Sequence, residues 1–290
     1  MKDTHNGTRA QQQGQLESPK SPRGIRRVRA VSIASVMILM TSLLLGRVHP
    51  FGDPALFAAK RASEPIMEHS AVPPEVRATL VAKCADCHSM QTAAPIYGRF
   101  APVSWLMERD ILNGRKEINL SLWDTYSADQ QQIIKAKIVQ ETKSREMSLP
   151  QYRMIHWNAR ITDADVRTFT QWTHQMPSLQ AGSMAQASEP GDPARGREVF
   201  EKRCTGCHSL EENREGPKLQ GVYGRTSGKA PGFTYSEALI KAAIVWDEVS
   251  LEQWLADTDA LVPGNNMDFR VPKPQERRDV ASFLKQQSGK

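Results

Sequence analysis

The sequence predicts an all-α fold, with two helical domains in tandem after a single N-terminal transmembrane helix. Three observations lead to this prediction. A pentapeptide pattern, C-x-x-C-H, occurs twice and uses all four cysteines of the 290-residue chain. Helix start and stop signals flank both copies, and the alternating apolar pattern of strands does not occur around them. An uncharged apolar run, residues 30–46, lies near the N-terminus.

Each copy of the pentapeptide places two thiols three positions apart, directly before a histidine. The copies are Cys84, Cys87 and His88, and Cys204, Cys207 and His208. This spacing is the attachment signature of c-type haem. Both thiols can form thioethers with the haem vinyl groups, and the histidine that follows can bind the iron. We therefore predict two covalently bound haem c groups, with iron as the metal.

Other roles for four cysteines fit less well. A zinc site needs four ligands, usually from two separated pairs, and the histidine after each pair would then be a coincidence. A thioredoxin-like C-x-x-C expects a βαβ context, which this sequence does not indicate. Two disulfides would suit an exported protein but would not explain the histidines.

The second axial ligand of each iron is predicted to be a methionine. Met267 and Met147 each follow the histidine of their own motif by 59 positions, in an irregular segment ahead of a terminal helix. A methionine ligand raises the reduction potential of haem iron, whereas a lone methionine otherwise often fills gaps in a core. Competing residues in the first domain are Met154, His156 and Met107.

The apolar run favours a membrane anchor. Seventeen helical residues span about 25 Å, slightly less than a bilayer core, and Arg29 and Arg47 can extend to the two interfaces. The arginines ahead of the run place the N-terminus in the cytoplasm. We therefore expect the chain in the bacterial cytoplasmic membrane with its haem domains on the periplasmic side. No A-x-A-like cleavage site follows, so a retained anchor is favoured over a cleaved signal.

Composition divides the chain into six segments. Most of the net charge of +6 lies in residues 1–30, which contain seven Lys and Arg against two acidic residues. No basic patch on a folded domain is evident, so no nucleic-acid partner is expected. The predicted segments are a disordered basic arm (1–29), the membrane segment (30–46), a tether (47–71), the first haem domain (72–177), a linker (178–191) and the second haem domain (192–290).

Helices are expected throughout both haem domains. Prolines at positions 74 and 193 suit the first turns of helices that run into the two motifs. An Asn-Gly pair at 113–114 is expected to end a helix. The other expected helices cover residues 101–113, 128–142, 162–175, 236–243, 250–257 and 274–287.

The second domain resembles the class I cytochromes c over nearly its full length. Gly196 and Phe200 match the glycine and aromatic residue of the family's N-terminal helix, and Val280 and Phe283 match their partners on its C-terminal helix. The segment 216–219 matches the family's G-P-x-L. The resemblance implies a cytochrome c-like haem domain.

The same resemblance implies roles for four further residues. The carbonyl group of Pro217 would accept a hydrogen bond from His208 and so orient the iron ligand. By the same likeness, the haem propionates would be held by Arg225, Tyr235 and Trp246.

The first domain resembles a different group, the haem-binding domains that carry C-x-x-C-H-S followed by A-P-V-S-W. These patterns stand here at residues 84–89 and 101–105, and the segment 146–152 continues the likeness. The resemblance supports haem binding and a methionine ligand, and leaves the carbonyl that orients His88 unassigned. The tryptophans of this domain, at positions 105, 123, 157 and 172, are expected to pack around the haem.

The favoured function is electron transfer without enzymatic activity, by a membrane-anchored periplasmic di-haem cytochrome. The expected redox partners are a quinol–cytochrome c reductase, a terminal oxidase or a periplasmic dehydrogenase. The alternative is a di-haem peroxidase-like enzyme or a haem sensor with an open iron site in the first domain. An enzyme would need an acid–base residue above that iron, for which His156 and Glu146 are candidates.

Overall fold

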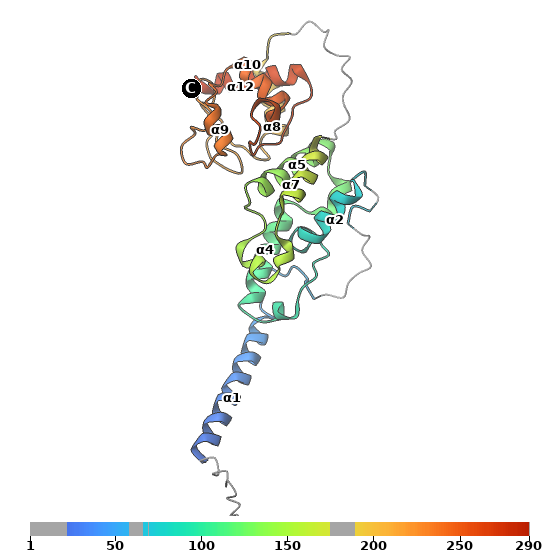
Figure 1. Cartoon of the computed structure of the whole chain (residues 1–290), viewed down its shortest axis with the longest axis vertical. Coiled ribbons are helices and arrows are strands. Elements are labelled where there is room, and N and C mark those ends of the chain that lie inside the picture. The colour runs from blue at the N-terminus through green and yellow to red at the C-terminus, as the bar shows by residue number, and fades with distance from the viewer. Residues whose placement is uncertain (1–21, 58–65, 69, 175–188, 290) are drawn as a thin grey trace, which may run out of the picture. The chain divides into compact units, whose positions relative to one another are not determined.

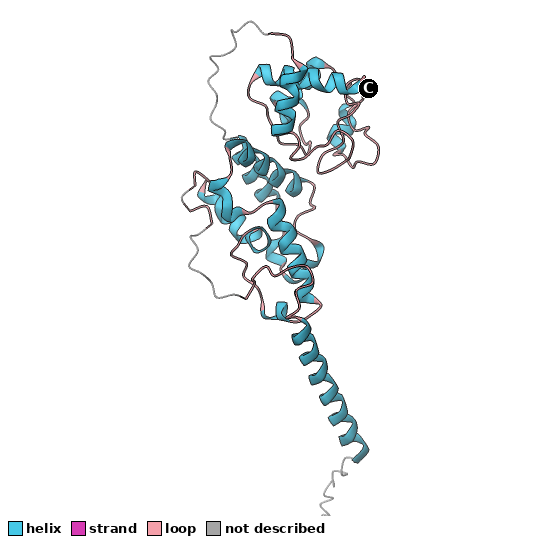
Figure 2. Cartoon of the chain, turned by 180° about the vertical axis from the view of Figure 1, so that it is seen from behind, coloured by secondary structure: helices cyan, strands magenta, loops and turns pink. Residues whose placement is uncertain are grey.

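The computed structural model describes residues 22–57, 66–68, 70–174 and 189–289. This part of the chain contains helices and loops but no strand, which confirms the all-α prediction, and an isolated bridge joins Thr226 and Val245 (Figure 2). The α-helices are α1 (Pro22–Leu45), α2 (Pro74–Lys83), α3 (Ala85–His88), α4 (Val103–Glu117), α5 (Ala128–Lys143), α6 (Pro150–Ile155), α7 (Asp163–His174), α8 (Pro193–Arg203), α9 (Glu237–Ala242), α10 (Glu248–Ala256), α11 (Thr258–Leu261) and α12 (Pro274–Ser288). Short 3-10 helices are η1 (Ile96–Arg99), η2 (Leu120–Thr125) and η3 (Trp157–Ala159).

The chain forms two compact units. The first unit consists of residues 1–52 and 95–108, and the second consists of residues 53–94 and 109–290. The second unit contains both C-x-x-C-H motifs. Its residues 53–94 and 109–174 are called the first domain below, and its residues 189–289 the second domain. Most of the predicted disordered arm and of the predicted linker lies outside the described residues.

The first unit contains the apolar helix α1 (Figure 1). Its stretch Arg26–Leu45 is exposed and has a mean hydropathy of 2.0. By length and composition this helix is able to cross a membrane. The predicted span, residues 30–46, lies within α1 apart from its last residue.

The C-terminal end of α1 packs against the segment that begins α4. The backbone N–H of Ala101 donates to the carbonyl oxygen of Ser42 at 3.0 Å. The indole Nε1 of Trp105 donates to the carbonyl oxygens of Leu45 and Val48, at 3.2 and 2.9 Å. These donors add hydrogen bonds to carbonyl groups in the last turn of α1 and just after it. The A-P-V-S-W segment therefore caps α1, and Trp105 does not pack around a haem as expected.

A hydrogen bond to a buried carboxyl group joins the same two segments. Glu108 on α4 is 2% exposed, and its carboxylate lies 2.7 Å from Nδ1 of His49. Burial of a polar group is costly unless the group is hydrogen-bonded. The residues just after α1 are thus part of a folded unit.

Helix α4 is longer than the sequence predicts. It continues past the Asn-Gly pair to Glu117. A Cβ atom at Gly114 would lie 2.8 Å from the carbonyl oxygen of Cys87. Gly114 therefore allows α4 to approach the first haem motif closely, and it does not end the helix.

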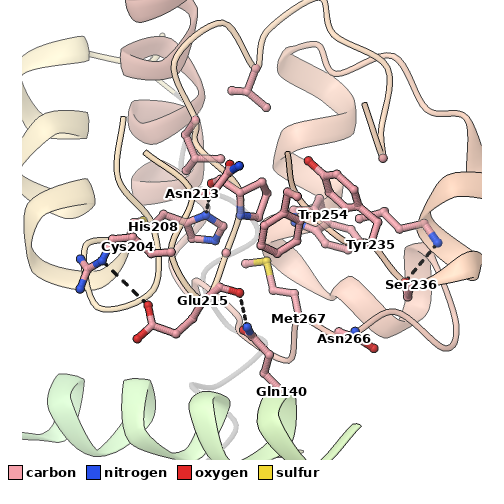
Figure 3. A pocket seen from close by; sticks show the side chains of 18 of the residues that line it. Gln140, Cys204, His208, Asn213, Glu215, Tyr235, Ser236, Trp254, Asn266 and Met267 are labelled. Atoms are coloured by element: carbon pink, nitrogen blue, oxygen red, sulfur yellow. Dashed lines mark hydrogen bonds and ion pairs between the residues drawn. The ribbon is translucent and has the colours of Figure 1, made fainter. Parts of the chain in front are cut away.

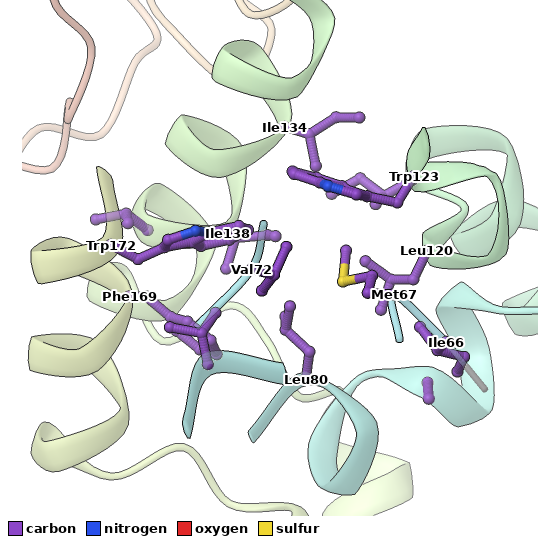
Figure 4. Close-up of a cluster of buried hydrophobic side chains, with 14 residues drawn as sticks. Ile66, Met67, Val72, Leu80, Leu120, Trp123, Ile134, Ile138, Phe169 and Trp172 are labelled. Atoms are coloured by element: carbon purple, nitrogen blue, oxygen red, sulfur yellow. The ribbon is translucent and has the colours of Figure 1, made fainter. Parts of the chain in front are cut away.

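The core of the first domain gathers around α2, α5 and α7 (Figure 4). Trp123 and Trp172 pack in this core with ring centroids 5.4 Å apart, whereas Trp157 is 85% exposed. The cluster consists of Ile66, Met67, Val72, Val76, Leu80, Ala85, Ile118, Leu120, Trp123, Ile134, Ile138, Val139, Phe169 and Trp172. The expected packing of these tryptophans around a haem is therefore wrong, because they fill the core behind the cavity or lie in solvent.

The second domain is built on the crossing of α8 and α12. Asp192 caps α8 by accepting the N–H of Ala194 at 2.7 Å. The Phe200 and Phe283 rings pack across the crossing with centroids 5.3 Å apart, and Gly196 lies against the backbone of α12. The contact predicted between the terminal helices is confirmed, and it fixes the helix that leads into Cys204.

A short network fixes the end of α2 against α7. The Nζ atom of Lys83 lies 2.5 Å from Oδ2 of Asp165, and the backbone N–H and hydroxyl of Thr162 donate to the same carboxylate at 2.7 Å each. Burial favours the neutral carboxyl, but the hydrogen bonds from Lys83 and Thr162 outweigh it and lower the pKa of Asp165. Lys83 directly precedes Cys84, so this network helps to position the first motif.

The substitution Asp165→Asn should lower the free energy of unfolding at pH 7 by about 1 kcal/mol, the scale of a partly exposed charged hydrogen bond. Because the folded pKa is lowered, the stabilisation is present above the unfolded carboxyl pKa of about 3.9. It is lost as the pH falls through the folded pKa. Urea denaturation between pH 7 and pH 2 measures this difference.

The control is Asp163→Asn. Asp163 pairs with Arg145 at 2.7 Å, but both side chains are mostly exposed, so the substitution should change stability little. A difference between Asp165→Asn and wild type that stays constant over the whole pH range would contradict the assigned role of this carboxylate.

Candidate haem-binding sites

The first site is a cavity of about 470 Å³ lined by one C-x-x-C-H motif. Cys84 reaches it from the junction between α2 and α3, Cys87 and His88 reach it from α3, and Met147 reaches it from the segment before α6. A volume in this range is typical of sites for small molecules and cofactors. The structure thus brings together all four residues predicted for the first haem.

The imidazole of His88 is oriented by a backbone carbonyl. Its Nδ1 atom lies 3.2 Å from the carbonyl oxygen of Ile118. A carbonyl oxygen only accepts hydrogen bonds, so Nδ1 carries the proton and Nε2 keeps its lone pair for a metal. Ile118 follows α4 and gives the orienting group that the sequence left unassigned.

The segment that carries Met147 is held by hydrogen bonds at both of its ends. The backbone N–H of Met147 donates to the carbonyl oxygen of Glu141 at 3.3 Å, at the end of α5. Just beyond it, the hydroxyl of Tyr152 donates to Asp86, inside the haem motif, at 2.8 Å. The segment that carries Met147 is therefore joined directly to the motif whose iron it is predicted to bind.

The competing ligands lie elsewhere. Met154 is 86% exposed, and His156 stacks on Tyr152 with ring centroids 4.2 Å apart. Met107 belongs to the first unit. These three side chains do not line the first cavity, which leaves Met147 as its methionine. Of the two acid–base candidates, His156 does not line this cavity either, and Glu146 lines the second one.

The second site is a cavity of about 380 Å³ in the second domain. Cys204 and His208 line it, and Cys207 lies between them in the same motif. Figure 3 shows the His208 ring and the Met267 sulfur directed into this cavity. The predicted ligands of the second haem therefore meet in one place.

The imidazole of His208 donates from Nδ1 to the carbonyl oxygen of Pro217 at 2.8 Å. The preceding residue must be glycine, because a Cβ atom at Gly216 would lie 2.3 Å from Cε1 of the imidazole ring. The loop thus passes directly against the ring. This geometry matches the role that the resemblance implied for Pro217, and it leaves Nε2 available to a metal.

The Met267 loop is fixed by two buried polar residues that the sequence analysis did not identify. The hydroxyl of Thr258 donates to the carbonyl oxygen of Met267 at 2.8 Å. The side-chain amide of Asn265 donates to Val262 and Asp259, at 2.8 and 3.1 Å. Both residues are fully buried. The only sequence signal was the irregular, polar composition of this loop.

Arg225, Tyr235 and Trp246 line the second cavity, as predicted for propionate partners. The guanidinium of Arg225 donates to the carbonyl oxygens of Lys218 and Gln220, at 3.0 and 3.3 Å. Burial lowers the pKa of Arg225 and raises that of Tyr235. A partly buried cation beside a phenol suits a carboxylate ligand. Sequence analysis did not identify Trp254, which packs on Trp246 in the cavity wall.

The surroundings of the four cysteines favour the protonated thiol over the thiolate. Burial raises the pKa of Cys84 and Cys204 to about 12, and the pKa of Cys87 and Cys207 to about 11. Redox-active cysteines show the opposite shift.

Burial also changes the pKa of the histidine in each motif. It lowers the pKa of both His88 and His208, which keeps the imidazoles neutral, as metal ligation requires. With apolar walls, paired thiols and a facing methionine, both cavities fit a covalently attached haem.

Two family models match the chain in succession. A model described as a haem-binding domain matches residues 52–175, and a model described as cytochrome c matches residues 193–288. The matches follow the order in which the two resemblances occur in the sequence. They support haem binding in both parts of the chain.

Similar proteins match the second part. Cytochrome c of Chlamydomonas reinhardtii is 43% identical over 100 residues, covering 33% of this chain and 89% of that protein. Cytochrome c2 of Rhodomicrobium vannielii is 39% identical over 109 residues, covering 36% of this chain and 86% of that protein. A solved structure, cytochrome cH from Methylobacterium extorquens, is 41% identical, covers 33% of this chain and 99% of that chain, and gives a TM-score of 0.32.

Replacement of Met267 by alanine should expose one iron to added ligands. We expect the reduction potential of that haem to fall by on the order of 0.1 V, within the roughly 0.8 V range that axial ligands set. Carbon monoxide should then bind to the ferrous protein. Potentiometric titration with optical spectra measures both effects.

The matched control is Met154→Ala, because Met154 is 86% exposed and does not line either cavity. It should leave the potentials and carbon monoxide binding unchanged. An unchanged potential in Met267→Ala would show that another group binds the iron.

Proposed function

The chain belongs to the cytochrome c family, and from this premise we propose that it is a membrane-anchored electron carrier with one haem c in each cavity. The observation that carries the proposal is the repeated site. Each cavity combines a C-x-x-C-H turn, a histidine held by a backbone carbonyl and a facing methionine. Haem iron supplies reversible one-electron chemistry when bound in such a site.

The protein's own residues would bind and tune the cofactors. The pairs Cys84 and Cys87, and Cys204 and Cys207, would form the thioethers. His88 with Met147, and His208 with Met267, would fill both axial positions of each iron. Filled axial positions leave no site for a substrate, which favours electron transfer over catalysis.

Apolar side chains line part of each site and would keep water away from a bound haem. In the second cavity Trp246, Trp254 and Leu251 form part of this lining. A dry surrounding disfavours the extra positive charge of the oxidised site and so adds to the effect of the methionine. Arg225 and Tyr235 would hold the propionates at the rim.

We also propose that α1 is retained as a membrane anchor and is not a cleaved signal. Its last turn is built into the first unit through Ser42 and Leu45, which accept hydrogen bonds from Ala101 and Trp105. Cleavage after α1 would remove these acceptors. It would also leave His49, whose imidazole contacts buried Glu108, close to a new chain end.

The arginines ahead of the apolar run favour an N-terminus in the cytoplasm, which would put the haem domains in the bacterial periplasm. A tether to the membrane would raise the effective concentration of the carrier near membrane-bound partners. A quinol–cytochrome c reductase, a terminal oxidase or a periplasmic dehydrogenase would be suitable redox partners.

A potentiometric titration of the full-length protein in detergent tests the electron-carrier proposal. We expect two one-electron transitions, six-coordinate low-spin spectra in both oxidation states and little reaction with carbon monoxide. High-spin signal from one haem, with rapid carbon monoxide binding, would instead favour an enzyme or sensor with an open site.

Membrane fractionation tests whether the anchor is retained. A protein with tags at both ends should stay in the membrane after alkaline carbonate extraction and should keep its N-terminal tag. The variant Glu108→Ala should weaken the packing at the end of α1 without changing its apolar run. A soluble product whose first residue lies after position 46 would contradict retention.

A further inference from the structure

Helix α5 is buried on two faces. Ile134, Ile138 and Val139 lie in the core of the first domain. Ile133 and Ala136, on the neighbouring face, pack with the hydrophobic cluster of the second domain. A surface helix normally buries one apolar stripe, so α5 serves as a shared wall between the domains.

A close apolar contact lies at the second C-x-x-C-H motif. A Cβ atom at Gly206, between the two cysteines, would lie 2.6 Å from Cγ2 of Ile133. This methyl group sits on a β-branched side chain that has little rotational freedom in a helix. Gly206 therefore allows α5 to lie directly on the turn that carries Cys204 and Cys207.

Polar contacts continue along the same helix. Nζ of Lys137 lies 3.1 Å from Glu215, and the side-chain amide of Gln140 donates to the carbonyl oxygen of Glu215. Glu215 comes just before the Gly216–Pro217 loop that orients His208. Helix α5 thus braces the loop that holds the second histidine.

Two glutamates connect the two cavities. Glu141 and Glu215 line both of them, and Glu141 also accepts the backbone N–H of Met147. A continuous series of covalent and hydrogen bonds therefore leads from His208 through the 215–217 loop and α5 to Met147.

Ion pairs and buried hydrogen bonds surround this contact. Arg203 pairs with Asp129 at 3.1 Å at one end of α5, and Lys143 pairs with Asp259 at 3.4 Å at the other. The contact is extended by Thr173, whose hydroxyl donates to fully buried Asp268 at 2.6 Å. The interface therefore combines an apolar centre with paired charges around it, as specific interfaces do.

We propose that the first domain is the built-in redox partner of the second, docked through α5 on the face around Gly206 and Glu215. This inference rests on the proposed function, because it requires a haem in each cavity. Electrons then pass between the two haems inside one chain. Each exchange oxidises one ferrous iron and reduces one ferric iron, so no other reactant is needed.

The experiment uses the full-length holoprotein in detergent and the variant Ile133→Glu. A buried carboxylate against Gly206 should separate the domains, because an unpaired charge in an apolar contact is costly. Hydrogen exchange of the amides in α5 and in residues 203–217 reports the docking. Optical spectra recorded after photoreduction with less than one electron per protein report electron redistribution between the haems.

Wild type should show protected amides in both segments and a redistribution rate that does not depend on protein concentration. Ile133→Glu should lose this protection and the concentration-independent phase, while both haem spectra stay six-coordinate. The matched control is Ile155→Glu at a 60% exposed isoleucine of the same domain, which should keep both properties.

The variant Gln140→Ala gives a milder change if Ile133→Glu does not fold. Alanine keeps the helix propensity of α5 and removes one hydrogen bond to the 215 loop, so protection and the fast phase should both decrease. The inference is overturned if redistribution in wild type scales with protein concentration, or if it persists in a variant whose segments have lost protection. A protein with fewer than two haems would refute the proposed function itself.

Discussion

Each cavity depends on one hydrogen bond, from Nδ1 of the motif histidine to a backbone carbonyl oxygen. The acceptor is Ile118 for His88 and Pro217 for His208. The bond fixes which ring nitrogen carries the proton and turns the other nitrogen into the cavity. Without it the imidazole could rotate away from the facing methionine. The two acceptors come from unrelated local structures, the end of α4 and a Gly-Pro loop, so the same constraint is met in two ways.

The rest of each domain holds that carbonyl in place. In the second domain Gly216 brings the loop against the ring, and Gln140 of α5 binds the residue before it. In the first domain Gly114 lets α4 pass close to Cys87, and the helix then ends near Ile118. Much of the packing that stabilises each domain therefore also determines the direction of a metal ligand.

Local patterns made much of this predictable from the sequence. The haem motifs, the two facing methionines, Pro217 and the contact between the terminal helices follow from short signals with a direct chemical meaning. The Asn-Gly pair at 113–114 gave a wrong helix end, because Gly114 makes a contact with a distant segment that no local pattern reveals. The haem packing predicted for Trp105 was wrong for the same reason, since its indole binds the end of a helix about sixty positions earlier in the chain. The roles of α5, Thr258 and Asn265 depend on contacts between distant segments, and those appear only in the folded chain.

The mass of the intact, denatured protein tests the central claim most directly. Full-length protein made in cells that attach haem to C-x-x-C-H motifs should have the mass of the whole polypeptide plus two haem groups, since thioether bonds survive unfolding. The mass of the bare polypeptide would contradict covalent haem in either cavity, and the addition of a single group would leave one of the two cavities without its proposed cofactor.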